Sequence, residues 1–388
     1  MSLYARRGVS AQKEEVHAAT QHLDQGLFPK AFCKIYPDYL GGDDQWVNVM
    51  HADGAGTKSI LAYMYWKETG DISVWRGIAQ DAIVMNLDDL LCVGIHDNIV
   101  FNSTIDRNKT LIPGEVLEQI IGGSQELFDT LKSFGVNIAY LGGETADVGD
   151  VVRTVAVNGT MSVRWPKDKI ISNEKIKAGD VIVGLASSGQ SIYESAYNSG
   201  IGSNGLTSAR HDVLSKHYAQ AFPMTYEPTL SDDVVYIGKY RMTDLVMNES
   251  HNVGQLLLSP TRTYAPVVKE LLANHFDRIH GLVHCSGGGQ TKCLKFIPNN
   301  VRIVKDNLFE APYIFQIIQE CSGADLREMM QVFNMGCRLE IFCAPEDAQV
   351  MLDTAAKFGI DARIIGRVEA ADKKSLEIQH AGETIIFE

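Results

Sequence analysis

The chain has 388 residues, of which 45% are hydrophobic and 21% are charged, which is ordinary for a globular protein of two or three domains. Its formal net charge of −13 disfavours a surface for nucleic acid or an anionic membrane, so we expect neither as a partner. The seven cysteines include no Cys-x-x-Cys pair, which argues against a disulfide framework or a structural zinc site. Without an apolar signal-peptide core or an apolar run of membrane-spanning length, the sequence predicts a cytoplasmic protein.

The first informative segment follows a predicted helix at residues 11–23 and a predicted strand at residues 46–52. It reads Asp53-Gly54-Ala55-Gly56-Thr57-Lys58. Glycines allow backbone N–H groups to approach a phosphate closely, and the aspartate and lysine suit Mg²⁺ and phosphate. The segment is not a Walker A motif, because Thr57 separates Gly56 from Lys58. A strand-ending turn with a solvated lysine is the alternative interpretation.

Residues 71–93 predict a long helix on which Asp81, Asp88 and Asp89 fall on one side. Carboxylates gathered in this way repel one another unless water or a cation lies between them. They are therefore either a solvated helix face or part of a cation site.

A second helix is predicted to begin at Pro113-Gly114 and to have Gly135 as its C-terminal cap. The predicted strand at residues 136–141 leads into a second glycine loop, Gly142-Gly143-Glu144-Thr145. An alternating pattern at residues 151–163 then predicts a strand that returns antiparallel.

The charged stretch at residues 167–177 and the turn after it indicate a domain boundary, so we divide the chain into residues 1–167 and 168–388. Residues 190–252 are less regular and predict insertions. A third glycine loop, Ser286-Gly287-Gly288-Gly289, follows another predicted strand. The other elements predicted in the second half are strands at residues 181–186, 282–284 and 362–365 and helices at residues 263–275 and 345–358. Short sheets mixed with helices predict an α+β fold rather than one doubly wound sheet.

Taken together, the ordered segments resemble the aminoimidazole ribonucleotide synthetase family, also called phosphoribosylformylglycinamidine cyclo-ligase, over nearly the whole chain. The segments that carry the resemblance are Tyr4-Ala5-Arg6-Arg7-Gly8-Val9, Asp53–Lys58, Asp88-Asp89-Leu90-Leu91, Gly142-Gly143-Glu144-Thr145-Ala146, Ser187-Ser188-Gly189, Ser203-Asn204-Gly205, Pro260-Thr261-Arg262, Ser286–Gly289 and Phe333-Asn334-Met335-Gly336. Each segment is a weak signal alone, whereas the ordered set is specific.

This resemblance implies a two-domain subunit whose N-terminal sheet pairs with a second copy, so that a homodimer has a barrel-like core. The C-terminal domain would be an α/β sandwich. ATP and Mg²⁺ would be the cofactors, and a phosphoribosyl compound, formylglycinamidine ribonucleotide, would be the substrate. The implied reaction is ATP-dependent ring closure to aminoimidazole ribonucleotide, with release of ADP and phosphate.

The resemblance also implies roles for individual residues. Asp53, Asp89 and Glu144 are the candidate Mg²⁺ ligands, and with Lys58, which would lie against the phosphate chain, they are the candidate catalytic residues. Asp88 and Asp147 would support the metal ligands from behind. The candidate nucleotide-binding residues are Gly54, Gly56, Thr57, Lys58, Gly142, Gly143, Asn334 and Gly336. The candidate ligands of the substrate phosphate are Ser203, Asn204, Gly205, Ser286, Gly287, Gly288 and Gly289.

The chain departs from the family pattern at Gly202, where the family has a histidine, and in an apparent insertion at residues 190–201. Histidine is a natural proton carrier near neutral pH, so its replacement leaves the general acid or base unassigned. The histidines that could substitute for it are His51, His211, His251 and His284, although a lone histidine is more often structural than catalytic. Two alternatives therefore stay open. The chain is either an ATP-dependent enzyme of the same superfamily with another substrate, or a nucleotide-binding paralogue without turnover.

Overall fold

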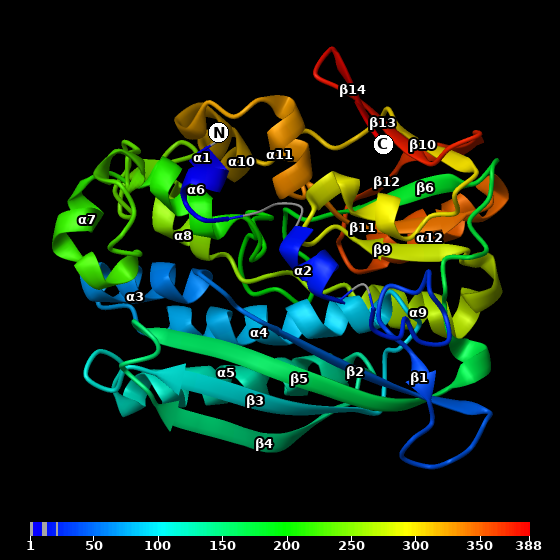
Figure 1. The fold of residues 1–388 in the computed structure, drawn as a ribbon, viewed down its shortest axis with the longest axis horizontal. Helices are drawn as coiled ribbons and strands as arrows, with labels where there is room; N and C mark the ends of the chain where they lie inside the picture. The colour runs from blue at the N-terminus through cyan, green and yellow to red at the C-terminus, as the bar shows by residue number, and fades with distance from the viewer. Residues whose placement is uncertain (1–2, 10–13, 21) are drawn as a thin grey trace.

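Two β-sheets, one from each half of the chain, organise the computed structural model, which describes residues 3–9, 14–20 and 22–388 (Figure 1). Within these residues the N-terminal sheet has five strands in the order β1-β2-β5-β3-β4, and neighbours run antiparallel except β3 and β4. The strands are β1 (Tyr36–Pro37), β2 (Trp46–Gly54), β3 (Ile99–Arg107), β4 (Ile138–Asp147) and β5 (Val155–Pro166). In β5, buried residues alternate with more exposed ones, as in a sheet with one face packed on a core.

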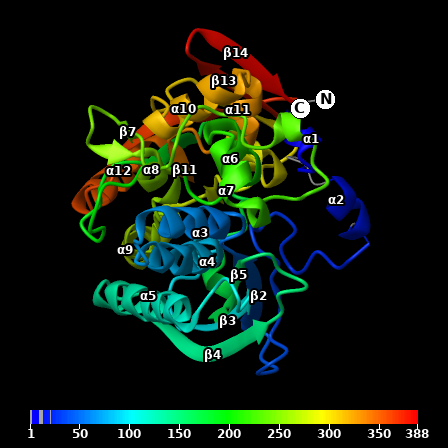
Figure 2. The same cartoon turned by 90° about the vertical axis from the view of Figure 1, so that its left-hand side faces the viewer.

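Helices cover one face of this sheet. They are α3 (Lys58–Thr69), α4 (Val74–Leu91) and α5 (Gly114–Ser133). Nearly every side chain of α4 is buried, because the helix lies between the sheet and the C-terminal half of the chain (Figure 2). In contrast, α5 is amphipathic and buries one stripe of residues that includes Ile120 and Phe128.

The opposite face of the N-terminal sheet is open in the single chain (Figure 1). Three apolar side chains on this face, Met50, Val100 and Leu141, are exposed by 73%, 37% and 66%. Strands of a sheet alternate their side chains between the two faces, so Met50, Val100 and Leu141 lie on one face of the sheet, where Ser162 of β5 pairs with both Met50 and Val100. We call this face the open face.

The C-terminal sheet has seven strands within the described residues, in the order β14-β13-β10-β12-β6-β11-β9. The strands are β6 (Val181–Ala186), β9 (Gly281–His284), β10 (Val301–Lys305), β11 (Cys337–Cys343), β12 (Ala362–Ala370), β13 (Ser375–His380) and β14 (Glu383–Phe387). Every residue of β9 and β11 is buried, because helices pack on both faces of the sheet. These helices include α9 (Ala265–His275), α10 (Tyr313–Ser322), α11 (Leu326–Val332) and α12 (Ala348–Lys357). The C-terminal domain is therefore a sandwich of helices around a sheet.

The remaining α-helices and strands of the described residues are short. They are α1 (Leu3–Arg6), α2 (Glu14–Thr20), α6 (Leu206–Val213), α7 (His217–Ala221), α8 (Val253–Leu258) and the two-stranded pair β7 (Leu245–Val246) and β8 (His251–Asn252). Among the residues described, no helix is both long and apolar enough to cross a membrane.

The predicted α+β fold is confirmed, and most predicted elements lie within a few residues of their expected bounds. Of the helix predicted at residues 11–23, residues 14–20 are helical, and residues 11–13 and 21 lie outside the described part. One local expectation is wrong. Gly142 and Gly143 do not form a loop after a strand, because β4 continues through them to Asp147. The division at residue 167 stays a prediction.

Candidate functional site

The first glycine loop is the turn between β2 and α3. The Ala55 N–H donates to the Val157 carbonyl oxygen at 2.9 Å, and Gly56 has a φ of 58°, which favours glycine. A Cβ on Gly54 would lie 2.1 Å from the Asn158 side-chain oxygen, so this position also requires glycine. Because α3 begins at Lys58, the loop lies at a helix N-terminus, where backbone N–H groups favour an anion.

Lys58 itself is fully buried at the contact between the domains. Its Nζ donates to Asp81 Oδ1 at 2.9 Å, to the Gly202 carbonyl oxygen at 3.1 Å and to the Ser259 carbonyl oxygen at 2.5 Å. An ammonium group has three N–H donors, so all of them are used. Contact between Lys58 and a phosphate, as the sequence predicts, would require these bonds to open.

Glycine loops from the two domains meet beside α3. Thr57 and Thr207 share a hydrogen bond of 2.6 Å between their hydroxyl groups, which joins the first loop to the start of α6. A Cβ on Gly287 would lie 3.5 Å from Asn204 Nδ2, so the segment Ser203–Gly205 contacts the loop Ser286–Gly289. We use the name loop junction for residues 54–58, 203–205, 286–289 and 334–336. The structure thus brings together the predicted substrate-phosphate residues and the first nucleotide loop.

Asn334 holds several parts of the loop junction in place. Its Oδ1 accepts from Ser187 Oγ at 2.8 Å and from the Gly336 N–H at 2.9 Å, and its Nδ2 donates to the Gly200 carbonyl oxygen at 2.9 Å. The Asn334 carbonyl oxygen accepts from Gln290 at 2.6 Å. Asn334 is 5% exposed, so its side chain supports the loops from within.

The three predicted metal ligands do not form one cluster within a single chain. The register pairs Asp53 with Gly159 and Glu144 with Thr104, which places the two acids three strands apart, about 14 Å at ordinary strand spacing. They also point to opposite faces, with Glu144 on the open face. Among the described residues, no three His, Cys, Asp or Glu side chains could together hold a metal ion.

The two predicted supporting acids are also engaged. Asp88 is buried, where Oδ1 accepts from Thr263 Oγ1 at 2.6 Å, and burial raises its pKa to about 7. Asp147 forms ion pairs with Arg107 at 2.7 Å and Lys109 at 3.4 Å. The assignment of the metal ligands stays a prediction. The three acids do not come together within a single chain.

Asp89 instead lies between two histidines, one from each domain. Asp89 Oδ1 is 2.6 Å from His284 Nδ1, and Asp89 Oδ2 is 3.2 Å from His51 Nε2. His51 precedes Asp53 by two residues on the same face of β2, and His284 precedes Ser286 by two residues at the end of β9. This cluster therefore lies under the first and third glycine loops.

The hydrogen bonds determine which nitrogens of the cluster carry protons. Asn86 Nδ2 donates to three backbone carbonyl oxygens, so Asn86 Oδ1 accepts from the Nδ1–H of His51 at 3.0 Å. The other nitrogen of His51 faces the Asp89 carboxylate, which favours a second proton and a charged ring. His284 donates from Nδ1, and its Nε2 is buried without a partner among the described residues, so this ring is neutral.

Burial, hydrogen bonds and nearby charges shift the pKa values of His51, Asp89 and His284. Burial, aided by the charge of Arg338, lowers the pKa of His284 to about 4. Burial also acts against a charged His51, but hydrogen bonds and the charge of Asp89 outweigh it and raise the pKa of His51. Burial disfavours ionised Asp89 as well, yet the two histidines hold its pKa below the ordinary range.

We expect the pKa values of the two histidines to be shifted in opposite directions from the ordinary value of 6.5. The pKa of His284 should lie at about 4, and that of His51 above 6.5. His284 therefore lowers folding stability progressively as pH falls from 6.5 towards 4, because the unfolded chain takes up a proton that the folded chain does not. The stability that His51 contributes is present below pH 6.5 and is lost as pH rises through its raised pKa. NMR titration, assigned with His51→Gln and His284→Gln, measures both. Two midpoints near 6.5 would contradict the assignment.

The sequence interpretation named His51 and His284 only as possible replacements for the missing family histidine, and it missed Asn86. One signal was available, since His51 shares a strand face with Asp53. The link between His51 and His284 carries no sequence signal, because the two residues lie in different domains.

The fold and the loop junction define a class, a two-domain α+β protein whose glycine loops meet where the domains join. The chain belongs to the AIR synthase related family. Residues 40–162 match its N-terminal domain, and residues 177–379 match its C-terminal domain, each described as "AIR synthase related protein".

Curated relatives share about a third of their residues with this chain. A phosphoribosylformylglycinamidine cyclo-ligase of Methanocaldococcus jannaschii is 33% identical over 320 residues, which are 82% of this chain and 77% of the relative. The enzyme of that name from Methanothermobacter thermautotrophicus is 31% identical over 339 residues, covering 87% and 84%. The one from Pyrococcus furiosus is 32% identical over 307 residues, covering 79% and 75%.

Solved structures of low sequence identity share the fold. A crystal structure of a HypE-HypF complex aligns with a TM-score of 0.56 at 15% identity, covering 98% of this chain and 99% of that one. Thiamine monophosphate kinase from Aquifex aeolicus gives 0.54 at 11%, covering 96% and 95%. T. maritima PurL complexed with ADP gives 0.52 at 12%, covering 99% and 52%. At these identities the likeness supports the fold alone.

Proposed function

We propose that the chain is a phosphoribosylformylglycinamidine cyclo-ligase, which closes formylglycinamidine ribonucleotide to aminoimidazole ribonucleotide with ATP in purine biosynthesis. The observation that carries this proposal is the loop junction, where glycine-rich segments of both domains meet within hydrogen-bond reach. The names of relatives at about 30% identity support the same reaction. We place the enzyme in the cytoplasm, in accord with seven free cysteines.

The chemistry needs phosphate binding more than it needs a reactive side chain. An amide oxygen is a poor leaving group, so ATP would transfer its γ-phosphoryl group to the formyl oxygen of the substrate. The amidine nitrogen then attacks that carbon, the C–N bond closes, and phosphate departs with the former formyl oxygen. Phosphoryl transfer depends mainly on positioning and on neutralising charge, which backbone N–H groups at the loop junction provide.

Mg²⁺ would come with the nucleotide, where it neutralises phosphate charge. Mg²⁺ in such enzymes is usually held by one or two carboxylates together with phosphate oxygens and water, so a complete protein cage is not required. Asp53, half-buried at the end of β2, is the carboxylate of the first glycine loop and fits this role. Asp89 fits less well, since both of its oxygens already contact histidines.

Ring closure also releases a proton from the attacking amidine nitrogen. The cluster of His51, Asp89 and His284 supplies a neutral imidazole beside a carboxylate and lies under two of the glycine loops. We assign proton uptake to this cluster, in place of the family histidine that Gly202 replaces. Burial lowers the pKa of His284 to about 4 and its side chain is 0% exposed, so the proton would enter the cluster through His51, whose side chain is 20% exposed.

The proposal is tested by incubating the purified protein with Mg–ATP and formylglycinamidine ribonucleotide. We expect phosphate and aminoimidazole ribonucleotide in equal amounts, and phosphate release only when the substrate is present. ATP binding without substrate-dependent phosphate would favour the paralogue without turnover. Phosphate release with a different acceptor would favour a superfamily enzyme with another substrate.

We also propose a homodimer that pairs the open faces of two N-terminal sheets. The open face exposes Met50, Val100 and Leu141, and a second copy would bury them. Glu144 lies on the same face, so it would contribute to a metal or nucleotide site only across the contact between subunits. This arrangement reconciles the predicted role of Glu144 with its distance from Asp53.

The dimer proposal predicts that Met50→Glu yields monomers, because it places two buried carboxylates at the centre of the contact. Analytical ultracentrifugation measures the mass. Ile386→Glu is the matched control, since Ile386 is an exposed apolar residue on β14 in the other domain, and we expect it to stay dimeric. A dimeric Met50→Glu protein, or a monomeric unmodified one, would exclude pairing through this face.

A further inference from the structure

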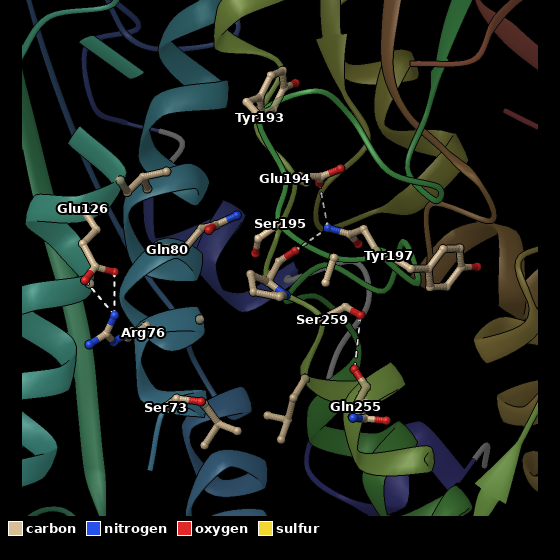
Figure 3. A pocket seen from close by; sticks show the side chains of 18 of the residues that line it. Ser73, Arg76, Gln80, Glu126, Tyr193, Glu194, Ser195, Tyr197, Gln255 and Ser259 are labelled. Atoms are coloured by element: carbon tan, nitrogen blue, oxygen red, sulfur yellow. Dashed lines mark hydrogen bonds and ion pairs between the residues drawn. The ribbon is translucent and has the colours of Figure 1, made fainter. Parts of the chain in front are cut away.

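A cavity between the two domains lies away from the loop junction. It has a volume of about 700 Å³ and lies between the N-terminal half of α4, helix α5 and two C-terminal segments, residues 193–198 and 258–263 (Figure 3). No residue of the loop junction lines it. Its volume falls in the range of small-molecule sites. We call it the α4 cavity.

Among the described residues that line the α4 cavity, Arg76 is the one lysine or arginine, and it is already paired. Arg76 donates to both oxygens of Glu126 at 2.6 and 2.9 Å and to Gln119 at 2.7 Å. Glu194 forms an ion pair with Arg262 behind the cavity wall at 2.5 Å. With these pairs neutralised, Asp71 leaves the lining slightly negative. A ligand that carries phosphate groups would therefore meet repulsion here.

Three uncharged side-chain oxygens in the lining form no hydrogen bond with the described residues. They are the side-chain oxygen of Gln80, the hydroxyl of Ser195 and the hydroxyl of Tyr197, labelled in Figure 3. The half-buried Tyr197 ring adds an aromatic face. Oxygen acceptors beside such a ring suit a flat heterocycle that carries N–H donors.

We propose that the α4 cavity is a second ligand site, which binds an uncharged purine base or nucleoside and is coupled to the loop junction. The coupling would run through residues 259–264, which separate the two sites. On one side, Thr261 donates from N and Oγ1 to Asp81, the partner of Lys58, at 2.8 and 2.6 Å. On the other side, the Thr261 carbonyl oxygen accepts from Gln80 of the cavity lining at 2.8 Å.

A second pair of contacts repeats this arrangement two residues further along the segment, at Thr263. Thr263 Oγ1 donates to Asp88 at 2.6 Å, while the Thr263 carbonyl oxygen accepts from the hydroxyl of Tyr193 at the same distance. A ligand that moves Gln80 or Tyr193 therefore acts on the segment that holds Asp81 and Lys58. The two sites share one hydrogen-bonded element, which is what energetic coupling between sites requires.

Binding is tested by calorimetric titration of the full-length protein with adenosine while Mg–AMPPCP saturates the nucleotide site. We expect adenosine to bind under these conditions and 5′-AMP to bind at least about tenfold more weakly, because it adds a phosphate. Ser195→Trp fills the cavity without removing a described contact, and we expect it to weaken adenosine binding about tenfold or more. Lys373→Trp, at an exposed position of the same domain outside the cavity lining, is the matched control and should bind normally.

Each outcome decides the proposal. Absence of adenosine binding at millimolar concentration would overturn it, and so would 5′-AMP that binds as tightly as adenosine. Adenosine binding that Ser195→Trp leaves unchanged would show that the ligand lies elsewhere.

Coupling is tested with the same variants. We expect adenosine to change the dissociation constant of Mg–AMPPCP by about fivefold or more in the unmodified protein, and AMPPCP to change that of adenosine by the same factor. Ser195→Trp should abolish both effects. Independent binding of the two ligands would overturn the coupling. These readouts measure binding, so they remain informative even if the cyclo-ligase assay fails.

Discussion

Replacement of Asp53 by Asn is expected to lower kcat/KM for the cyclo-ligase reaction by about 100-fold or more, because it removes the carboxylate of the first glycine loop. In the unmodified protein, the Gly54 N–H donates to Asp53 Oδ1 at 2.7 Å. Asparagine has the same size as aspartate and keeps a side-chain oxygen that can accept this hydrogen bond. The fold should therefore remain intact. Steady-state kinetics measure the loss, and thermal unfolding checks the fold.

Asp372→Asn is the control for loss of one negative charge, because Asp372 is exposed in the turn before β13. We expect it to leave both activity and stability unchanged. If Asp53→Asn retained full activity across a range of Mg²⁺ concentrations, Asp53 would not be the carboxylate that the metal–nucleotide complex contacts.

Replacement of Lys58 by Met is expected to destabilise the protein by about 3–5 kcal/mol, because Asp81 is left buried without its cation. Both side chains of this pair are fully buried, so water cannot replace the lost charge. Urea unfolding measures the change. Lys67→Met on the same helix is the control, since Lys67 is exposed and lies over the Trp66 ring.

A second variant separates a structural role of Lys58 from a role in phosphate binding. Lys58→Met combined with Asp81→Asn removes both charges and keeps an acceptor for Thr261, so most of the lost stability should return. If Lys58→Met were as stable as the unmodified protein but inactive, Lys58 would be a phosphate ligand instead of a link between domains.

Local sequence patterns predicted the elements that frame the site. The spacing of apolar residues, and the glycine and proline residues beside it, predicted β6 and α5 nearly at their observed bounds. Both patterns follow from the burial of one stripe or face of the element. The same reasoning misread the carboxylates of α4. Asp81 and Asp88 bind Thr261 and Thr263, partners from the other domain that no local pattern reveals.

The predicted metal site shows a second limit of the sequence. Asp53 and Glu144 each adjoin glycines, which made their convergence a reasonable expectation. Strand order and side-chain direction depend on tertiary pairing, however, and the observed order places β5 and β3 between the two acids. The link between the half-buried His51 and the buried His284 carried no local signal either, because Asp89 joins them only in the folded chain.

In the proposed reaction, ATP phosphorylates the formyl oxygen of the substrate at the loop junction. The most direct measurement uses formylglycinamidine ribonucleotide labelled with ¹⁸O in the formyl group, Mg–ATP and the purified protein, with mass analysis of the phosphate released. We expect each phosphate to carry one ¹⁸O atom from the substrate. Unlabelled phosphate, formed together with aminoimidazole ribonucleotide, would contradict this mechanism.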